Sequence, residues 1–97
     1  MNSKLTAENI EMLYRAIVSL ETVEECRRFF DDICTVVEVR DMAQRLQVAQ
    51  MLEQKIIYAD IVKLTGASTA TISRINRCRE YGSGGYRMVL ERLKDGE

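Results

Sequence analysis

The spacing of apolar residues along the chain predicts a protein made of helices. Apolar side chains recur three or four positions apart through most of the sequence, which is the spacing of an amphipathic helix. Nothing in the sequence indicates a strand, and proline is absent. We therefore expect an all-α fold with about six helices, over residues 6–20, 22–33, 36–54, 58–65, 68–80 and 86–95.

The third of these stretches, residues 36–54, is apolar over much of its girth. A helix of this kind is buried on more than one side, and in so short a chain the second side is expected to meet another copy. A stripe of apolar residues runs along one face of this helix, and further apolar residues lie on either side of the stripe. Together these residues are Val36, Val39, Met42, Ala43, Leu46, Val48, Ala49, Met51 and Leu52.

Residues 22–33 hold both phenylalanines of the chain. A capping box is predicted at their start, since Glu25 follows Thr22 by three positions. Phe29 and Phe30 are adjacent and so point about 100° apart on a helix. One can fill the core of its own subunit while the other enters a partner, and the equal alternative is that both belong to one core. Ninety-seven residues favour a single domain over 1–97, with residues 6–54 used for dimerisation.

Residues 58–80 have the pattern of a helix-turn-helix. Ile61 and Leu64 are predicted to share one face before the turn at residues 66–68, and Ile72 and Ile75 repeat that spacing after it. Two short helices whose apolar faces meet across a glycine turn form the unit that lays its second helix in the major groove of DNA. The alternative is an ordinary αα-hairpin with a glycine C-cap and a serine N-cap.

The side chains expected to face outward from this unit are small, hydroxylic or basic. Between residues 68 and 79 there are three arginines and no acidic residue, whereas a solvated face usually mixes both charges. Short side chains allow close approach to base edges, and arginine binds phosphate or guanine. The candidate DNA-binding residues are Lys63, Ser68, Thr69, Ala70, Thr71, Ser73, Arg74 and Arg77.

The charges are unevenly distributed although the net charge is only −1. Residues 1–41 hold five basic and nine acidic side chains, a balance of −4, and residues 42–97 hold nine and six, a balance of +3. This asymmetry fits an acidic half used for assembly and a basic half used for contact with DNA, the alternative being an uneven surface without a role.

Several other classes of protein are disfavoured. The chain has no histidine, and its three cysteines, Cys26, Cys34 and Cys78, lack metal-ligand spacing, so buried reduced thiols are expected and neither a metal nor a cofactor is. No nucleophile–base pair indicates an enzyme. No apolar run is long enough for a membrane span, and the N-terminal residues do not resemble a signal peptide, so a cytoplasmic protein is expected.

Three segments carry a resemblance to a known family: RFFDDICTVVE, AQRLQVAQML and GASTATISR. With them the chain resembles the Trp repressor superfamily, most closely its YerC/YecD group, from about Leu5 to Lys94. The resemblance implies an intertwined dimer of all-helical chains, and a bacterial transcriptional regulator that binds double-stranded operator DNA.

The resemblance also implies an effector pocket at Thr35, Arg45 and Arg74, which match the corepressor-binding threonine and arginines of the family. Two neighbouring positions depart from the pattern: Ile75 stands where the family has a glycine beside the indole ring, and Cys78 stands where it has a serine. A branched side chain should fill that slot, so tryptophan is not expected to bind. An unidentified small effector is left open, as is a role for both arginines in a structural ion pair or a phosphate contact.

We therefore expect a homodimeric, sequence-specific DNA-binding regulator, most simply a repressor. The alternative is a helical dimeric module whose basic face binds an acidic protein and which has no DNA target. Salt separates the two, because phosphate contacts release counterions and give affinity for DNA a steep dependence on salt concentration.

Overall fold

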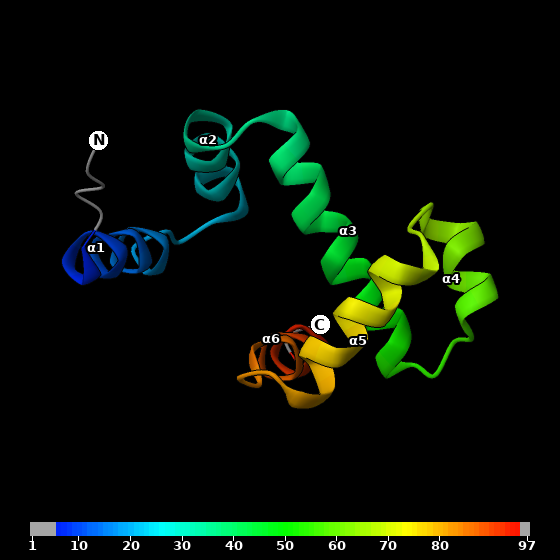
Figure 1. Cartoon of the computed structure of the whole chain (residues 1–97). Helices are drawn as coiled ribbons and strands as arrows, with labels where there is room; N and C mark the ends of the chain where they lie inside the picture. Colours follow the sequence, from blue (N-terminus) through cyan, green and yellow to red (C-terminus); the bar gives the residue numbers. More distant parts are fainter. Residues whose placement is uncertain (1–5, 96–97) are drawn as a thin grey trace. The chain divides into compact units, whose positions relative to one another are not determined.

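The computed structural model describes residues 6–95, and within that range it contains six α-helices and no strand (Figure 1). This confirms the predicted all-α fold. Residues 1–5 and 96–97 lie outside the described residues. The helices are α1 (Ala7–Val18), α2 (Val23–Ile33), α3 (Val36–Glu53), α4 (Tyr58–Thr65), α5 (Thr69–Tyr81) and α6 (Gly85–Asp95).

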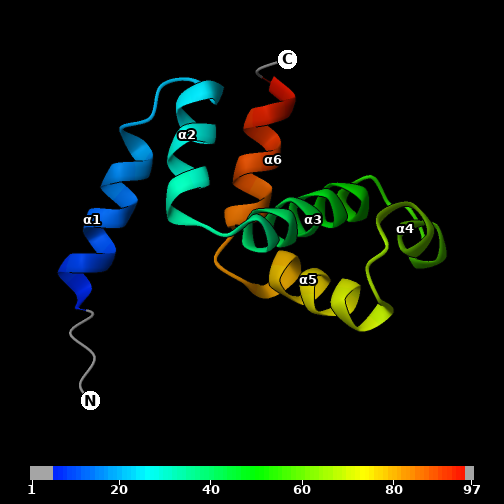
Figure 2. The same cartoon turned by 90° about the horizontal axis from the view of Figure 1, so that it is seen from above.

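The chain divides into two compact units, residues 1–36 and 37–97. In the first unit α1 and α2 run in opposite directions (Figure 2). Thr22 caps α2 by accepting the N–H of Glu25 at 3.0 Å. The return bond of the predicted capping box is displaced by one residue, because the Glu25 carboxylate accepts the N–H of Glu21 at 2.8 Å and not that of Thr22.

None of the residues described in the first unit, 6–36, is buried, although both of its helices are amphipathic. Phe29 and Phe30 pack edge to face with ring centroids 5.8 Å apart, and both are half-buried. The expected burial of thiols is wrong for Cys26 and, in the second unit, for Cys78, both of which are exposed, while Cys34 is half-buried. In the first unit the reason is that two short helices cannot by themselves enclose a side chain.

The second unit contains the hydrophobic core. Only the C-terminal half of α3 contributes to it, whereas Val37 and Met42 near the start of that helix are exposed. The apolar girth predicted for residues 36–54 is thus buried at one end of the helix alone. The core residues are Val48, Ala49, Met51, Leu52, Ile61, Ala67, Ile72, Ile75 and Leu90.

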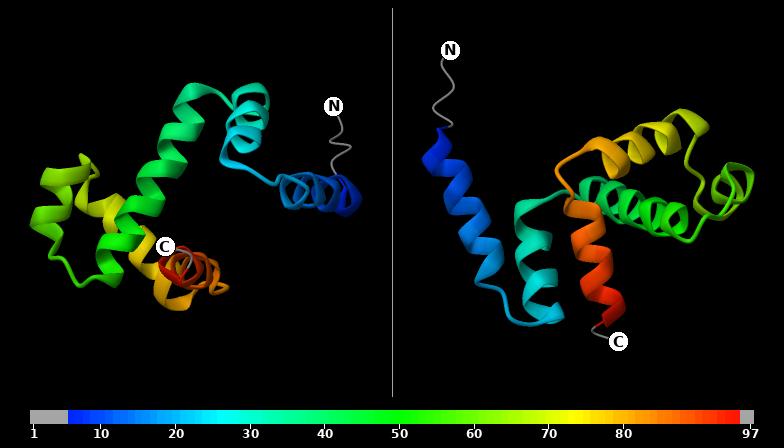
Figure 3. Two further views of the ribbon diagram at one scale, coloured as in Figure 1. Left: turned by 180° about the vertical axis from the view of Figure 1, so that it is seen from behind. Right: turned by 90° about the horizontal axis from the view of Figure 1, so that it is seen from below.

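Within this unit α5 crosses α3, and α4 and α6 lie on opposite sides of the crossing (Figures 1 and 3). Because Ile72 and Ile75 are buried in the same cluster as the C-terminal half of α3, the core fixes the inner face of α5. None of the helices described between residues 6 and 95 is both long and apolar enough to cross a bilayer.

The link from α3 to α4 begins with a residue in an unusual conformation. Lys55 has φ +63°, in the left-handed region that favours glycine. Its N–H donates to the carbonyl of Leu52 at 3.0 Å, and the N–H of Ile56 donates to that of Met51 at 3.0 Å. These are the two bonds of a Schellman motif, which ends α3 with a lysine at the position usually held by glycine.

Candidate nucleic-acid interface

The turn between α4 and α5 is fixed by local hydrogen bonds. Gly66 has φ +77°, and its N–H donates to the carbonyl of Val62 at 2.9 Å, which ends α4. The hydroxyl of Thr65 then accepts the N–H of Ala67 at 3.1 Å. Since Ala67 is buried in the core, the turn cannot swing away from the body of the unit. The structure therefore contains the predicted helix-turn-helix.

The inner face of α4 differs from the prediction at one position. Ile61 is fully buried, but Leu64, expected beside it, is 66% exposed. At 100° per residue, a side chain three positions on lies about 60° away from the first and one four positions on lies about 40° away. In α4 the position four residues after Ile61 faces the core of the second unit. Half-buried Thr65 therefore continues the inner face of the helix, and Leu64 does not.

The start of α5 is capped by Ser68. Its hydroxyl oxygen accepts the N–H of Thr71 at 3.1 Å, and its hydroxyl lies 3.0 Å from that of Thr71. Both hydroxyls proposed for DNA contact thus have a role in the cap, and Thr71 is half-buried. The N–H groups of Thr69 and Ala70 have no acceptor among the described residues, as is usual in the first turn of a helix. Together with the helix dipole they form a site suited to an anion.

The outer face of α5 brings the remaining candidates together. Thr69, Ala70, Ser73, Arg74 and Arg77 are all exposed, and Lys63 on α4 is exposed as well. Within residues 6–95 none of these three basic side chains takes part in an ion pair. The face is therefore small at one end, cationic along its length and free of acidic partners.

The third arginine of this segment has a different position. The side chain of Arg79 is only 12% exposed and forms ion pairs with Glu53 of α3 and Glu80 of α5. Sequence reasoning counted Arg79 with the basic face and did not predict its partners. The only available sign was the opposite charge on a neighbouring predicted helix, 26 positions away, which spacing alone cannot resolve.

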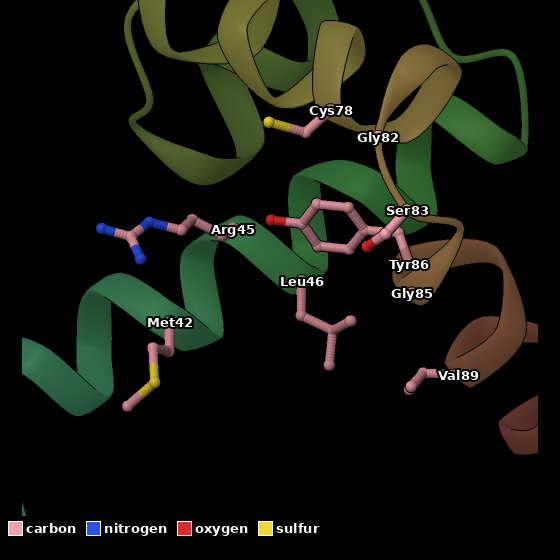
Figure 4. A pocket seen from close by; sticks show the side chains of 9 residues that line it. All are labelled: Met42, Arg45, Leu46, Cys78, Gly82, Ser83, Gly85, Tyr86 and Val89. Carbon is pink, nitrogen blue, oxygen red and sulfur yellow. The ribbon is translucent and has the colours of Figure 1, made fainter. Parts of the chain in front are cut away.

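A groove of about 570 Å³ lies beside the other face of α5 (Figure 4). Arg45 from α3, Cys78 from α5 and Tyr86 from α6 line it, together with apolar side chains. Arg74 is not among its lining residues. Neither Arg45 nor Arg74 takes part in an ion pair within residues 6–95 of one chain. The full lining is Met42, Arg45, Leu46, Cys78, Gly82, Ser83, Gly85, Tyr86 and Val89.

The remaining members of the effector prediction lie elsewhere. Ile75 is 3% exposed and belongs to the core, so its side chain lies on the inner face of α5. Thr35 precedes α3 in the first unit. The effector set of Thr35, Arg45 and Arg74 stays a prediction. In the part of the chain that the structure describes, no cluster of His, Cys, Asp or Glu is arranged to hold a metal ion.

The fold and this surface define an all-helical protein with a helix-turn-helix. The chain belongs to the Trp repressor protein family, whose model matches residues 8–94. It is 50% identical over 94 residues to the uncharacterized protein YerC of Bacillus subtilis (strain 168), covering 97% of this chain and 90% of that protein.

Solved structures agree with this assignment. A crystal structure of a candidate Trp repressor from Staphylococcus aureus has a TM-score of 0.88 and 48% identity, over 94% of this chain and 91% of that one. A TrpR-like protein from Eubacterium eligens has a TM-score of 0.89 and 48% identity, over 96% of each chain. The family is one of DNA-binding helix-turn-helix regulators, and the resemblance found in the sequence is confirmed.

Proposed function

We propose that this protein is a sequence-specific DNA-binding regulator of transcription, most simply a repressor, which acts as a homodimer. The observation that carries the proposal is the outer face of α5, which is exposed, cationic and free of acidic side chains while its inner face is locked in the core. Such a helix is held rigidly but leaves its polar face available to the major groove.

Each exposed residue has a role that follows from its length and charge. Thr69, Ala70 and Ser73 are short and would face base edges, where Ala70 and the methyl of Thr69 suit a thymine methyl group. Arg74 and Arg77 have the reach to bind flanking phosphates, and Arg77 is also suited to a guanine. Lys63 adds a backbone contact from α4.

The homodimer is proposed because both units leave apolar surface uncovered. The first unit carries exposed apolar side chains on α1, and none of its described residues is buried. The second unit has the apolar groove beside Tyr86. A second copy supplies complementary apolar surfaces of both kinds, and a two-fold pair presents two recognition helices to successive turns of DNA. The exposed apolar residues of α1 are Ile10, Met12, Leu13, Tyr14, Ile17 and Val18.

Light scattering and sedimentation test the assembly. A dimer is expected at micromolar concentration, and a stable monomer would contradict the proposal. Phe30→Asp is expected to dissociate or unfold the protein, because the half-buried Phe30 ring becomes buried in the proposed dimer, where a charge without a partner costs several kcal/mol. Glu24→Asp, at an exposed position on the same helix, is the control and should leave the mass unchanged.

DNA binding is tested by selecting bound duplexes from random DNA and then measuring affinity at several salt concentrations. Arg74→Ala should weaken specific and scrambled duplexes alike and make the salt slope shallower by about 0.9, the value for one lost phosphate contact. Thr69→Ala should instead alter which sequences are preferred, by about 1–3 kcal/mol at the altered position.

Arg92→Ala on α6 is the matched control, since Arg92 is exposed and forms no ion pair within residues 6–95. Failure of the wild-type protein to bind any duplex, with tight binding to an acidic protein instead, would favour the interaction module. Equal behaviour of Arg74→Ala and Arg92→Ala would remove α5 from the interface.

Tryptophan is not proposed as the effector. Ile75 stands where the family resemblance implies a glycine beside the ligand ring, and its branched side chain is buried, so titration calorimetry with tryptophan is expected to give no heat of binding. Binding at micromolar concentration would contradict this, and Ile75→Gly would then test whether the side chain limits affinity. An unidentified effector at Thr35, Arg45 and Arg74 stays a prediction.

A further inference from the structure

Four charged side chains join the ends of three helices in the second unit. Arg79 near the end of α5 donates to Glu53 at the end of α3, and also to Glu80 at 2.9 Å. Arg87 on α6 donates to the same two carboxylates, to Glu53 at 3.2 Å and to Glu80 at 3.3 Å. Each arginine therefore binds both glutamates, which closes a four-membered network across α3, α5 and α6.

The central member of this network is also the least exposed. The side chain of Arg79 is 12% exposed, and its Nε and Nη2 atoms donate to the Asn76 side-chain oxygen at 3.3 and 3.0 Å. Every nitrogen of its guanidinium thus has an acceptor within the protein. Arg79 is held in place and is not available to a phosphate, unlike Arg74 and Arg77 on the same helix.

The turn of the helix-turn-helix, which precedes the other end of α5, is attached to α3 as well. The side-chain amide of Gln44 donates to the carbonyl of Thr65 at 3.1 Å, at the start of the turn. The helix α3 thus contacts the helix-turn-helix at two places, through Gln44 beside the turn and through Glu53 beside the end of α5.

The hydrogen bond from Arg79 lowers the pKa of the Glu53 carboxyl, with burial opposing it, so this acid is charged at neutral pH.

We propose that Arg79 and Glu53 are positioning residues for DNA recognition, which fix the angle of α5 on α3 and α6 and thereby the placement of its exposed side chains. The inference rests on the proposed function. The 13 residues of α5 span about 20 Å, so a tilt of about 10° around its buried middle moves each end by about 1.7 Å. Such a shift breaks a hydrogen bond to a base edge.

The direction in which Glu53→Gln changes the affinity for DNA shows whether Glu53 acts by positioning Arg79 or only through its negative charge. Glu53→Gln removes a negative charge, and if Glu53 acted only through its charge, DNA would bind as tightly as before or more tightly. If Glu53 instead holds Arg79, affinity for the preferred duplex falls about tenfold, the size of one lost base contact. Affinity for scrambled duplexes should change much less.

The matched control is Glu91→Gln on α6, which makes the same charge change at an exposed residue without an ion pair in the described chain. Arg79→Gln should resemble Glu53→Gln, and the double variant should be no weaker than the worse single variant, because both disrupt one contact. Amide hydrogen exchange over residues 77–81 should be faster in Glu53→Gln than in the control, which reports the loosened end of α5 without DNA.

The outcomes are distinct. If the wild-type protein binds no duplex, the proposed function fails and the inference fails with it. If the wild type binds and Glu53→Gln binds the preferred duplex as tightly as Glu91→Gln, only the inference is overturned. Unchanged exchange over residues 77–81 also overturns it. Should Arg79→Gln not fold, Glu80→Gln tests the same network from its other carboxylate, with the same expected loss.

Discussion

Substitution of Ser68 separates the folding role of the α5 N-terminus from its proposed contact with DNA. Ser68 accepts the N–H of Thr71 at 3.1 Å, and it adjoins the free N–H groups of Thr69 and Ala70. Ser68→Ala removes the capping oxygen and adds no charge. Ser68→Asp keeps a capping oxygen, since aspartate is as good an N-cap as serine, but places a negative charge at the proposed interface.

The two variants differ in the size and kind of their effects. Loss of the cap in Ser68→Ala should cost about 1 kcal/mol, which lowers the unfolding temperature by roughly 4–8 °C in a domain of this size. Ser68→Asp should unfold at or slightly above the wild-type temperature, because a carboxylate favours a helix N-terminus. A DNA phosphate about 5 Å away would repel that carboxylate by about 0.8–3 kcal/mol, a loss of affinity of about 4- to 150-fold.

Thermal unfolding followed by circular dichroism and binding to the selected duplex followed by fluorescence anisotropy give the two readouts. Thr6→Asp is the control, since Thr6 caps α1 by the same bond, accepting the N–H of Asn9 at 3.2 Å. A Ser68→Asp variant that folds and binds DNA as tightly as Thr6→Asp would refute the assignment of this helix end to the interface. An unchanged unfolding temperature in Ser68→Ala would refute the energetic role of the cap.

Three further outcomes are expected from the second unit. Ile61→Ala should lower the free energy of unfolding by about 2–5 kcal/mol and Leu64→Ala by less than about 0.5, since one is buried and the other exposed; denaturant titration would show similar losses if both faced the core. Lys55→Gly should increase the free energy of unfolding by about 1 kcal/mol, and so raise the unfolding temperature, because glycine adopts φ +63° without strain. The depressed pKa of Glu53 means that its contribution to stability is present above the pKa of the unfolded state, about 4.3, and is lost as pH falls through the folded value; Glu53→Gln should weaken this acid dependence, and identical pH–stability curves would contradict it.

The sequence alone determined the features that depend on neighbours along the chain. Helix starts at Thr22 and Ser68 and the break at Gly66 follow from a capping hydroxyl or a left-handed φ, both of which act within four residues. The helical period and the turn therefore sufficed to predict six helices and the helix-turn-helix, and the three segments RFFDDICTVVE, AQRLQVAQML and GASTATISR together sufficed for the family.

Tertiary structure decided what depends on residues far apart in sequence. A period of 3.6 residues leaves Leu64 and Thr65 nearly equivalent as inner positions, and only the direction in which α4 meets the body selects Thr65. In the same way, composition alone does not distinguish Arg79 from Arg74 and Arg77. In the structure Arg79 pairs with Glu53, 26 positions away, and so does not belong to the basic face. Charge and period are local properties, whereas the partner of a side chain is set by the packing of helices that are distant along the chain.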